Sequence, residues 1–153
     1  LYGDIKQDQV PILEGDGHTV RIISGTYLDQ KGAFEGKFVK ATYLDVQVQA
    51  KQTWIYETPQ DEKLFIYIVE GAGTFGRDED QLIQEKQAVL FSEGDRFIMH
   101  TKDQSIRFLL FMAKPIHEPI AWGGPIVMNT REELELAFQE LDENTFVKYR
   151  GEM

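Results

Sequence analysis

The chain has 153 residues, a net charge of -10 from 26 acidic and 16 basic residues, and no cysteine. The length is typical of a single domain with its own core, and the lack of cysteine excludes disulfides, thiolate catalysis and cysteine-ligated zinc. The acidic balance argues against direct nucleic-acid binding, and no apolar run is long enough to span a membrane. We therefore expect a cytoplasmic protein that binds neither nucleic acid nor a membrane.

The first residues, Leu1-Tyr2-Gly3-Asp4, lack both an initiating Met and the pattern of a signal peptide. We therefore expect the native chain to begin upstream of Leu1.

Short apolar runs separated by turn residues fill the middle of the chain. The predicted strands, in chain order, are 19–24, 43–50, 64–69, 74–75, 81–83, 87–91, 96–100 and 105–112. In the second of these, Leu44, Val46 and Val48 are expected to face the core, while Asp45 and the two glutamines after it face water. Such spacing predicts a small antiparallel, jelly-roll-like β-barrel.

Other segments of this region carry their own predictions. The continuous apolar run Leu64–Val69 is typical of a strand buried on both faces. Glu70–Gly73 is expected to break it, so that Thr74-Phe75 begins the return strand, and Asp78–Asp80 is expected to form a polar turn. The least regular stretch, Leu28–Gly36, is predicted to be a mobile loop.

The C-terminal part reads as an arm followed by a helix. Prolines at 115, 119 and 125 argue against a helix or a central strand in Lys114–Val127. Thr130-Arg131-Glu132-Glu133 fits a capping box and predicts a helix start. The apolar stripe of this helix is Leu134, Ala137, Phe138 and Leu141.

Several of these segments resemble the C-terminal domain of pirin-family proteins. They are VRIISG at Val20–Gly25, YLDV at Tyr43–Val46, FIYIVEG at Phe65–Gly71 and EPIAWGGPIVMNTREEL at Glu118–Leu134. The resemblance implies a bicupin, in which two jelly-roll barrels pack face to face and the last helix docks across them. For this chain it implies an all-β, cupin-type jelly-roll β-barrel (RmlC-like) with a short C-terminal α-helix.

The resemblance also divides the chain. Residues 1–18 would lead from a missing N-terminal domain, 19–113 would form the cupin barrel, 114–147 the wrapping arm and terminal helix, and 148–153 a tail.

The resemblance further implies that the N-terminal domain holds a metal through three His and one Glu. We therefore expect Fe or another divalent metal in that domain and no cofactor in this chain. A metal-binding cupin strand needs His-x-His, because residues i and i+2 point to one face of a strand. This chain has only His18, His100 and His117, and Trp54-Ile55-Tyr56 stands where the histidine pair would be. We therefore predict no metal ligands and no catalytic residues here.

Two sets of residues remain as candidate sites. The first would line a barrel pocket for a flat ligand and consists of Trp54, Tyr56, Tyr67, Phe75 and His100. The alternative is that the aromatics are core or interface filler and that His100 caps an edge strand rather than acting as a vestigial ligand or acid/base.

The second set would form an interdomain or self-association face and consists of Glu118, Trp122, Ile126, Met128, Leu134 and Phe138. The alternative is a helix folded back onto its own barrel.

The sequence thus predicts a metal-free C-terminal cupin domain that supports an N-terminal metal-binding cupin of the same protein. The alternative is part of a metal-dependent oxidoreductase, similar to the quercetin 2,3-dioxygenases, whose active site lies in that missing domain. A protein-binding regulatory module is a third reading. The expected partners are the N-terminal cupin domain, a second copy of the chain, or another protein.

Overall fold

Antiparallel strands dominate the computed structural model, which describes residues 4–76 and 78–148, with only the backbone for 78–80. The chain divides into two units, Leu1–Pro115 and Ile116–Met153. Among the helices of the described residues, none is long and apolar enough to cross a membrane.

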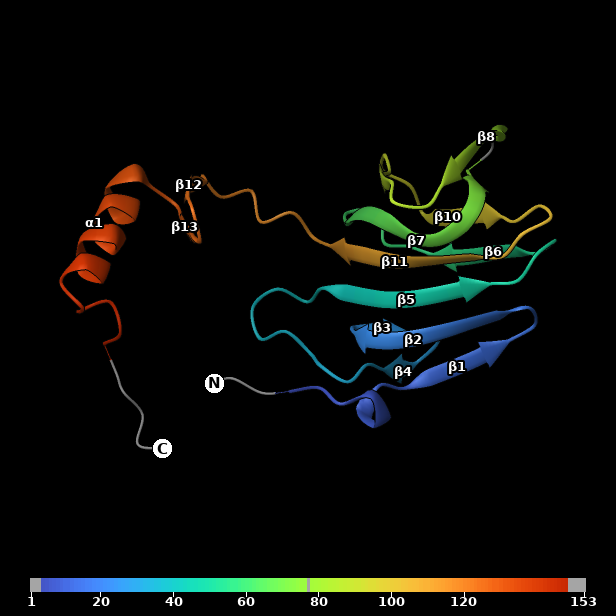
Figure 1. Ribbon diagram of the computed structural model, residues 1–153, viewed down its shortest axis with the longest axis horizontal. Coiled ribbons are helices and arrows are strands. Elements are labelled where there is room, and N and C mark those ends of the chain that lie inside the picture. The colour runs from blue at the N-terminus through green and yellow to red at the C-terminus, as the bar shows by residue number, and fades with distance from the viewer. Residues whose placement is uncertain (1–3, 77, 149–153) are drawn as a thin grey trace. The chain divides into compact units, whose positions relative to one another are not determined.

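The first unit is a curled antiparallel sheet (Figure 1). Its elements are a 3-10 helix, η1 (Gln7–Gln9), and the strands β1 (Ile12–Gly15), β2 (His18–Ser24), β3 (Thr26–Tyr27), β4 (Gln30–Lys31), β5 (Thr42–Val48), β6 (Thr53–Glu57), β7 (Lys63–Phe75), β8 (Asp78–Gln84), β9 (Ala88–Leu90), β10 (Arg96–His100) and β11 (Ile106–Ala113). The strand order is β1-β2-β5-β11-β7-β10-β6, with β8 and β9 both paired to β7. The predicted all-β barrel is confirmed.

The core lies inside the curl of this sheet. Its fully buried side chains include Val20, Ile22, Leu44, Val46, Val48, Ile66, Ile68, Met99, Phe108 and Leu110. The inward positions predicted on β5 are confirmed, because Leu44, Val46 and Val48 are all 0% exposed. The prediction that Asp45 faces water is wrong. Its side chain points to the other face of β5 but is buried, because the Arg107 side chain of the neighbouring strand covers it.

The strand β7 is not buried on both faces as predicted. Leu64, Ile66 and Ile68 are buried, whereas the alternate residues Phe65 and Tyr67 are 43% and 40% exposed. A continuous apolar run is expected for a strand buried on both faces, but also for a strand whose outer face is only partly covered. The sequence alone therefore could not distinguish these two cases.

The predicted break after Val69 is also wrong, since β7 continues to Phe75. Gly71 has a φ of +76°, which lets the strand bend without ending. The chain reverses only after Gly76, also at a φ of +76°, so residues 78–80 begin β8 rather than forming a turn.

Part of the predicted mobile loop is a small hairpin. Thr26–Tyr27 pairs with Gln30–Lys31, and the two residues between them, Leu28 and Asp29, have φ values of 45° and 64°. Two successive positive φ angles are typical of a tight two-residue hairpin turn.

The second unit contains a short hairpin and a helix. Its strands are β12 (Ala121–Gly123) and β13 (Ile126–Met128), and its helix is α1 (Arg131–Asp142). The hairpin was not predicted from sequence. The capping box is confirmed: the Thr130 hydroxyl accepts a hydrogen bond from the Glu133 backbone N–H, and the Glu133 carboxylate accepts one from the Thr130 N–H at 3.0 Å.

The helix packs against the hairpin at Gly123. A β-carbon at this position would lie 3.0 Å from the Phe138 ring and 3.2 Å from Leu134. The missing side chain therefore lets α1 approach β12 closely. Trp122 and Val127, the cross-strand pair that alternates with the packed residues, are 75% and 60% exposed.

Candidate functional site

Aromatic rings fill the interior of the barrel between β6, β10, β7 and β11. Trp54 is 2% exposed, and its ring centroid lies 5.7 Å from that of Phe97 and 5.8 Å from that of Phe108. Its indole Nε1 donates a hydrogen bond to the Tyr27 hydroxyl at 3.2 Å. The first residue of the Trp54-Ile55-Tyr56 segment is therefore a packed core side chain.

The three histidines lie on separate segments of the chain. His100 Nδ1 is 2.8 Å from Thr53 Oγ1, and His18 Nδ1 is 3.2 Å from the carbonyl oxygen of Asp16. His117 belongs to the second unit. Within the described part of the chain, no three His, Asp or Glu side chains form a group that could hold a metal ion.

The five predicted pocket residues do not form one lining. Trp54 and Phe75 belong to the aromatic interior, and Tyr56 stacks beside Trp54 at a centroid distance of 5.7 Å. Tyr67 faces outward from β7, because it alternates with buried residues. His100 lies on β10 in register with strand β6. Of the five, Tyr56 alone is among the lining residues of the cavity described next.

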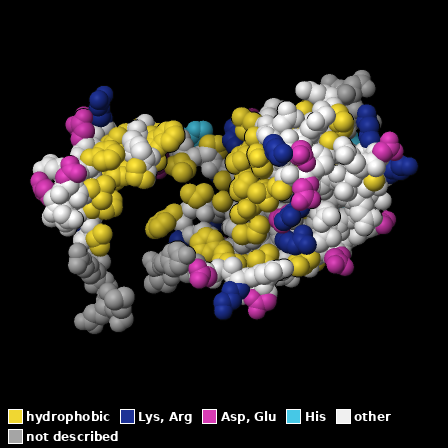
Figure 2. All heavy atoms as spheres, viewed as in Figure 1, with side chains coloured by type: hydrophobic (Ala, Val, Ile, Leu, Met, Phe, Trp, Pro, Cys, Tyr) yellow, Lys and Arg dark blue, Asp and Glu magenta, His cyan; other side chains and the backbone are white. Residues whose placement is uncertain are grey.

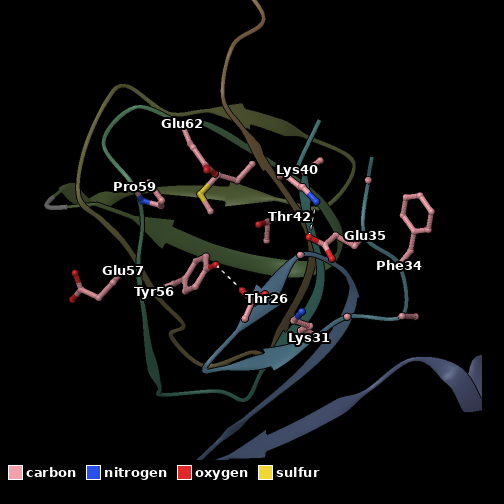
Figure 3. Close-up of a pocket in the computed structure, with 16 residues that line it drawn as sticks. Thr26, Lys31, Phe34, Glu35, Lys40, Thr42, Tyr56, Glu57, Pro59 and Glu62 are labelled. Atoms are coloured by element: carbon pink, nitrogen blue, oxygen red, sulfur yellow. Dashed lines mark hydrogen bonds and ion pairs between the residues drawn. The ribbon is translucent and has the colours of Figure 1, made fainter. Parts of the chain in front are cut away.

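A cavity of about 660 Å³ opens at the mouth of the barrel (Figure 3). The β3–β4 hairpin, the loop after it, the start of β5 and the segment from Tyr56 to Glu62 surround it. The Tyr56 hydroxyl points toward the carbonyl oxygen of Thr26, 3.5 Å away. A cavity of this size is sufficient for a small-molecule ligand.

Two of the charge pairs at this cavity are internal to the protein. Lys40 Nζ lies 2.6 Å from Glu35 Oε1, and this contact lowers the pKa of the Glu35 carboxyl. The Glu57 carboxylate accepts a hydrogen bond from Arg96 Nε at 3.0 Å. These three cavity-lining charges are therefore already compensated.

The remaining two cavity charges, Glu62 and Lys31, make no ion pair within the described residues. Burial, together with the charge of Asp61, raises the pKa of the Glu62 carboxyl. Burial, followed by the negative charge of Glu62, raises the pKa of Tyr56 to about 12. Lys114, the nearby cation, is engaged with Asp61 at 2.5 Å.

The outward face of the sheet carries an apolar row across four strands. Phe111 stacks on Tyr43 at a centroid distance of 4.4 Å and on Phe65 at 4.8 Å, and Phe65 is in register with Leu90, which is 75% exposed. We call Tyr43, Phe111, Phe65 and Leu90 the outer row. Figure 2 shows hydrophobic side chains gathered on the barrel unit where β11 ends and β5 begins.

The predicted interdomain face of the second unit is divided by the hairpin. Ile126 is 8% exposed, and Leu134 and Phe138 pack against Gly123 within the same unit. Trp122 lies on the opposite side of the hairpin, since it alternates with Gly123 along β12. The other two predicted residues are Glu118 and Met128. Glu118 accepts a 2.8 Å hydrogen bond from Asn129 Nδ2, and Met128 is a partly buried residue of β13.

Comparison with known proteins identifies the family. The family model described as the Pirin C-terminal cupin domain matches residues 43–147. The chain belongs to the pirin family. The resemblance that the Glu118–Leu134 segment predicted is thereby confirmed.

Individual pirin relatives match over nearly the whole chain. A Thermoplasma acidophilum protein named "Putative quercetin 2,3-dioxygenase" is 35% identical over 98% of this chain and 59% of its own length. Human pirin is 31% identical over 89% of this chain and 47% of its own length. The chain thus spans about half the length of the curated relatives that it matches.

Solved structures agree with this assignment. A quercetin 2,3-dioxygenase from Acinetobacter baumannii superposes with a TM-score of 0.82 at 27% identity, over 94% of this chain and 49% of the other. An RmlC-like cupin from Shewanella frigidimarina, 10% identical with a TM-score of 0.52 over 74% of this chain and 91% of the other, shares the fold alone. The cupin-type jelly roll predicted for this chain is confirmed.

Sequence reasoning missed both the outer row and the charged cavity. The row has a local signal, because Phe65 and Tyr67 are two apart and so must share a face. The cavity has no such signal, since Lys31 and Glu62 are brought together only by the barrel.

Proposed function

We propose that this chain is a pirin-family cupin domain without a metal centre of its own. Its role is to pack against an N-terminal, metal-binding cupin domain of the same protein. That domain would hold Fe or another divalent metal, and this one would cover its side and shape its pocket entrance. The observation that carries the proposal is the outer row, whose aromatic side chains contact one another on the outward face of the sheet.

The outer row supports a packing role because it exposes large side chains in contact with one another. Isolated exposed apolar residues are ordinary, but a contiguous aromatic patch usually marks an interaction site. Burying each such half-exposed side chain would contribute about 1–2 kcal/mol of association free energy before ordering costs. A domain of the same chain avoids most of the entropy cost of association.

The interior of the barrel supports the absence of a metal centre. Trp54 stands where the resemblance implies a ligand in a metal-binding cupin, and its hydrogen bond to Tyr27 and its contact with Phe97 fix the indole there. Replacing a packed indole by a ligand would require rebuilding the core around it. The match to the C-terminal domain family and the half-length coverage of the relatives support the proposal of a second domain.

A cysteine-labelling experiment tests the packing, because the chain has no cysteine of its own. Leu90→Cys lies in the outer row and Leu28→Cys in the β3–β4 turn, and the two native side chains are 75% and 74% exposed. In the isolated chain we expect both thiols to react with N-ethylmaleimide at similar rates. In the intact protein we expect labelling of Cys at position 90 to slow by about tenfold or more, with position 28 unchanged. Equal rates at position 90 in both proteins would refute the packing.

The alternative is that the intact protein is a metal-dependent oxidoreductase of the quercetin 2,3-dioxygenase type. The names of the Thermoplasma and Acinetobacter relatives favour it. This chain would then supply part of the scaffold, with the active site in the N-terminal domain. Flavonol oxidation by the intact protein, with no oxidation by this chain, is the expected result. Activity in the isolated chain would contradict both proposals.

A further inference from the structure

The cavity at the barrel mouth is lined by charged side chains that have no part in the proposed packing of the outer row. Of its five charged lining residues, Glu35 is paired with Lys40 and Glu57 with Arg96 of the neighbouring strand. Figure 3 shows the Glu57 carboxylate directed away from the cavity. The two cavity charges left without an ion pair among the described residues have opposite signs.

These two charges come from different walls. Glu62 belongs to the segment that precedes β7, and Figure 3 shows its carboxylate directed into the cavity. Lys31 belongs to β4, on the hairpin that closes another side. Among the described residues, no ion pair joins Glu62 to Lys31.

Glu62 is the better defined of the two. Its side chain is partly buried, and the nearby Lys114 is held by Asp61 at 2.5 Å. Lys114 also attracts the Glu62 carboxylate, but burial and the negative charge of Asp61 outweigh this attraction, so an incoming cation would stabilise the carboxylate. The Tyr56 ring and hydroxyl lie on the same side of the cavity, where an aromatic face attracts an ammonium group.

The lining also has an apolar part, beside the hydroxyls of Thr26 and Thr42. Met112, Pro59 and Ala33 belong to it, and the cavity of about 660 Å³ exceeds what a single bound ion needs. A flexible or short hydrocarbon spacer fits such a surface better than a second charged group would. The lining therefore describes a molecule with a charge at each end.

We propose that this cavity binds a small zwitterion that carries a protonated amine and a carboxylate joined by an apolar spacer. The amine lies against Glu62 and Tyr56, and the carboxylate lies against Lys31. The site is independent of the packing of the outer row, which is on the opposite face of the sheet strands.

Calorimetric titration of the chain tests this with ε-aminocaproate, which carries both groups, and with hexylamine and caproate, which carry one each. We expect ε-aminocaproate to bind about tenfold or more tightly than either single-charge probe. Glu62→Gln should weaken its binding by about tenfold, and Lys31→Gln should weaken it while leaving hexylamine binding unchanged.

The control variants Glu14→Gln and Lys102→Gln make the same charge changes at exposed positions that do not line the cavity. We expect both to bind ε-aminocaproate as the unmodified chain does, and circular dichroism checks that all four variants are folded. Equal weakening by Glu14→Gln and Glu62→Gln would show diffuse attraction to an acidic protein and would overturn the proposal. Equal affinity for ε-aminocaproate and hexylamine would also overturn it.

Discussion

Asp45 and Arg107 form an ion pair with two hydrogen bonds on the outer face of the sheet. The two guanidinium nitrogens Nε and Nη2 donate to the Asp45 carboxylate at 3.0 and 2.8 Å, and this pairing raises the pKa of Arg107. The Asp45 side chain is 9% exposed and that of Arg107 is 40% exposed. Removing the cation would therefore leave a nearly buried carboxylate without its partner.

We predict that Arg107→Ala lowers the free energy of unfolding by about 2 kcal/mol, a value reduced for the partial exposure of the guanidinium. Arg96→Ala is the matched control, because its pair with Glu57 is 51% and 70% exposed, and it should cost less than about 0.5 kcal/mol. Urea denaturation measures both. Equal costs would show that burial of Asp45 does not matter.

Tyr56 gives a prediction for alkaline pH. Its folded-state pKa of about 12 exceeds the ordinary tyrosine pKa of 10.0, so the folded state holds the phenolic proton more tightly than the unfolded state. Stability from this group is complete below pH 10 and falls as the pH rises from about 10 to about 12. Over this pH interval we expect the free energy of unfolding of the Tyr56→Phe variant to fall by about 2 kcal/mol less than that of the native chain. Parallel stability curves for the two proteins would contradict the assignment.

At the scale of elements, the bend of β7 depends on Gly71. Its φ is +76°, and a β-carbon there would lie 1.9 Å from the carbonyl oxygen of Ser105. We predict that Gly71→Ala costs about 3 kcal/mol or more, because it combines an unfavourable φ with a backbone clash. Gly94→Ala, where a β-carbon meets nothing within 4 Å, should change stability by less than about 0.5 kcal/mol. Thermal unfolding of the two variants makes the comparison.

The elements that were predictable are those with local causes. The capping box at Thr130 and the alternation of Leu44, Val46 and Val48 require only neighbouring residues, and both are as predicted. The course of β7 was not predictable, because a glycine can end a strand or bend it. Which of the two occurs depends on pairing with β11 and β10, which are distant in sequence.

At the scale of the whole molecule, the family resemblance gave the fold, but not the surfaces. The outer row is assembled from four strands whose register the sequence does not specify, and the cavity from loops that meet only in the barrel. The second unit shows the same limit. Its apolar helix stripe was predicted as a docking face, yet Leu134 and Phe138 are partly used in packing against Gly123. The outer row is therefore the stronger candidate for packing against a second domain.

The central claim is that the metal of the intact protein belongs to the other domain. Mass-spectrometric metal analysis, after incubation with Fe²⁺, Ni²⁺ or Zn²⁺ and removal of loosely bound ions, tests it most directly on this chain and on the intact protein. We predict a stoichiometric metal ion in the intact protein and only trace metal in this chain. A stoichiometric, tightly held metal ion in the isolated chain would contradict the account.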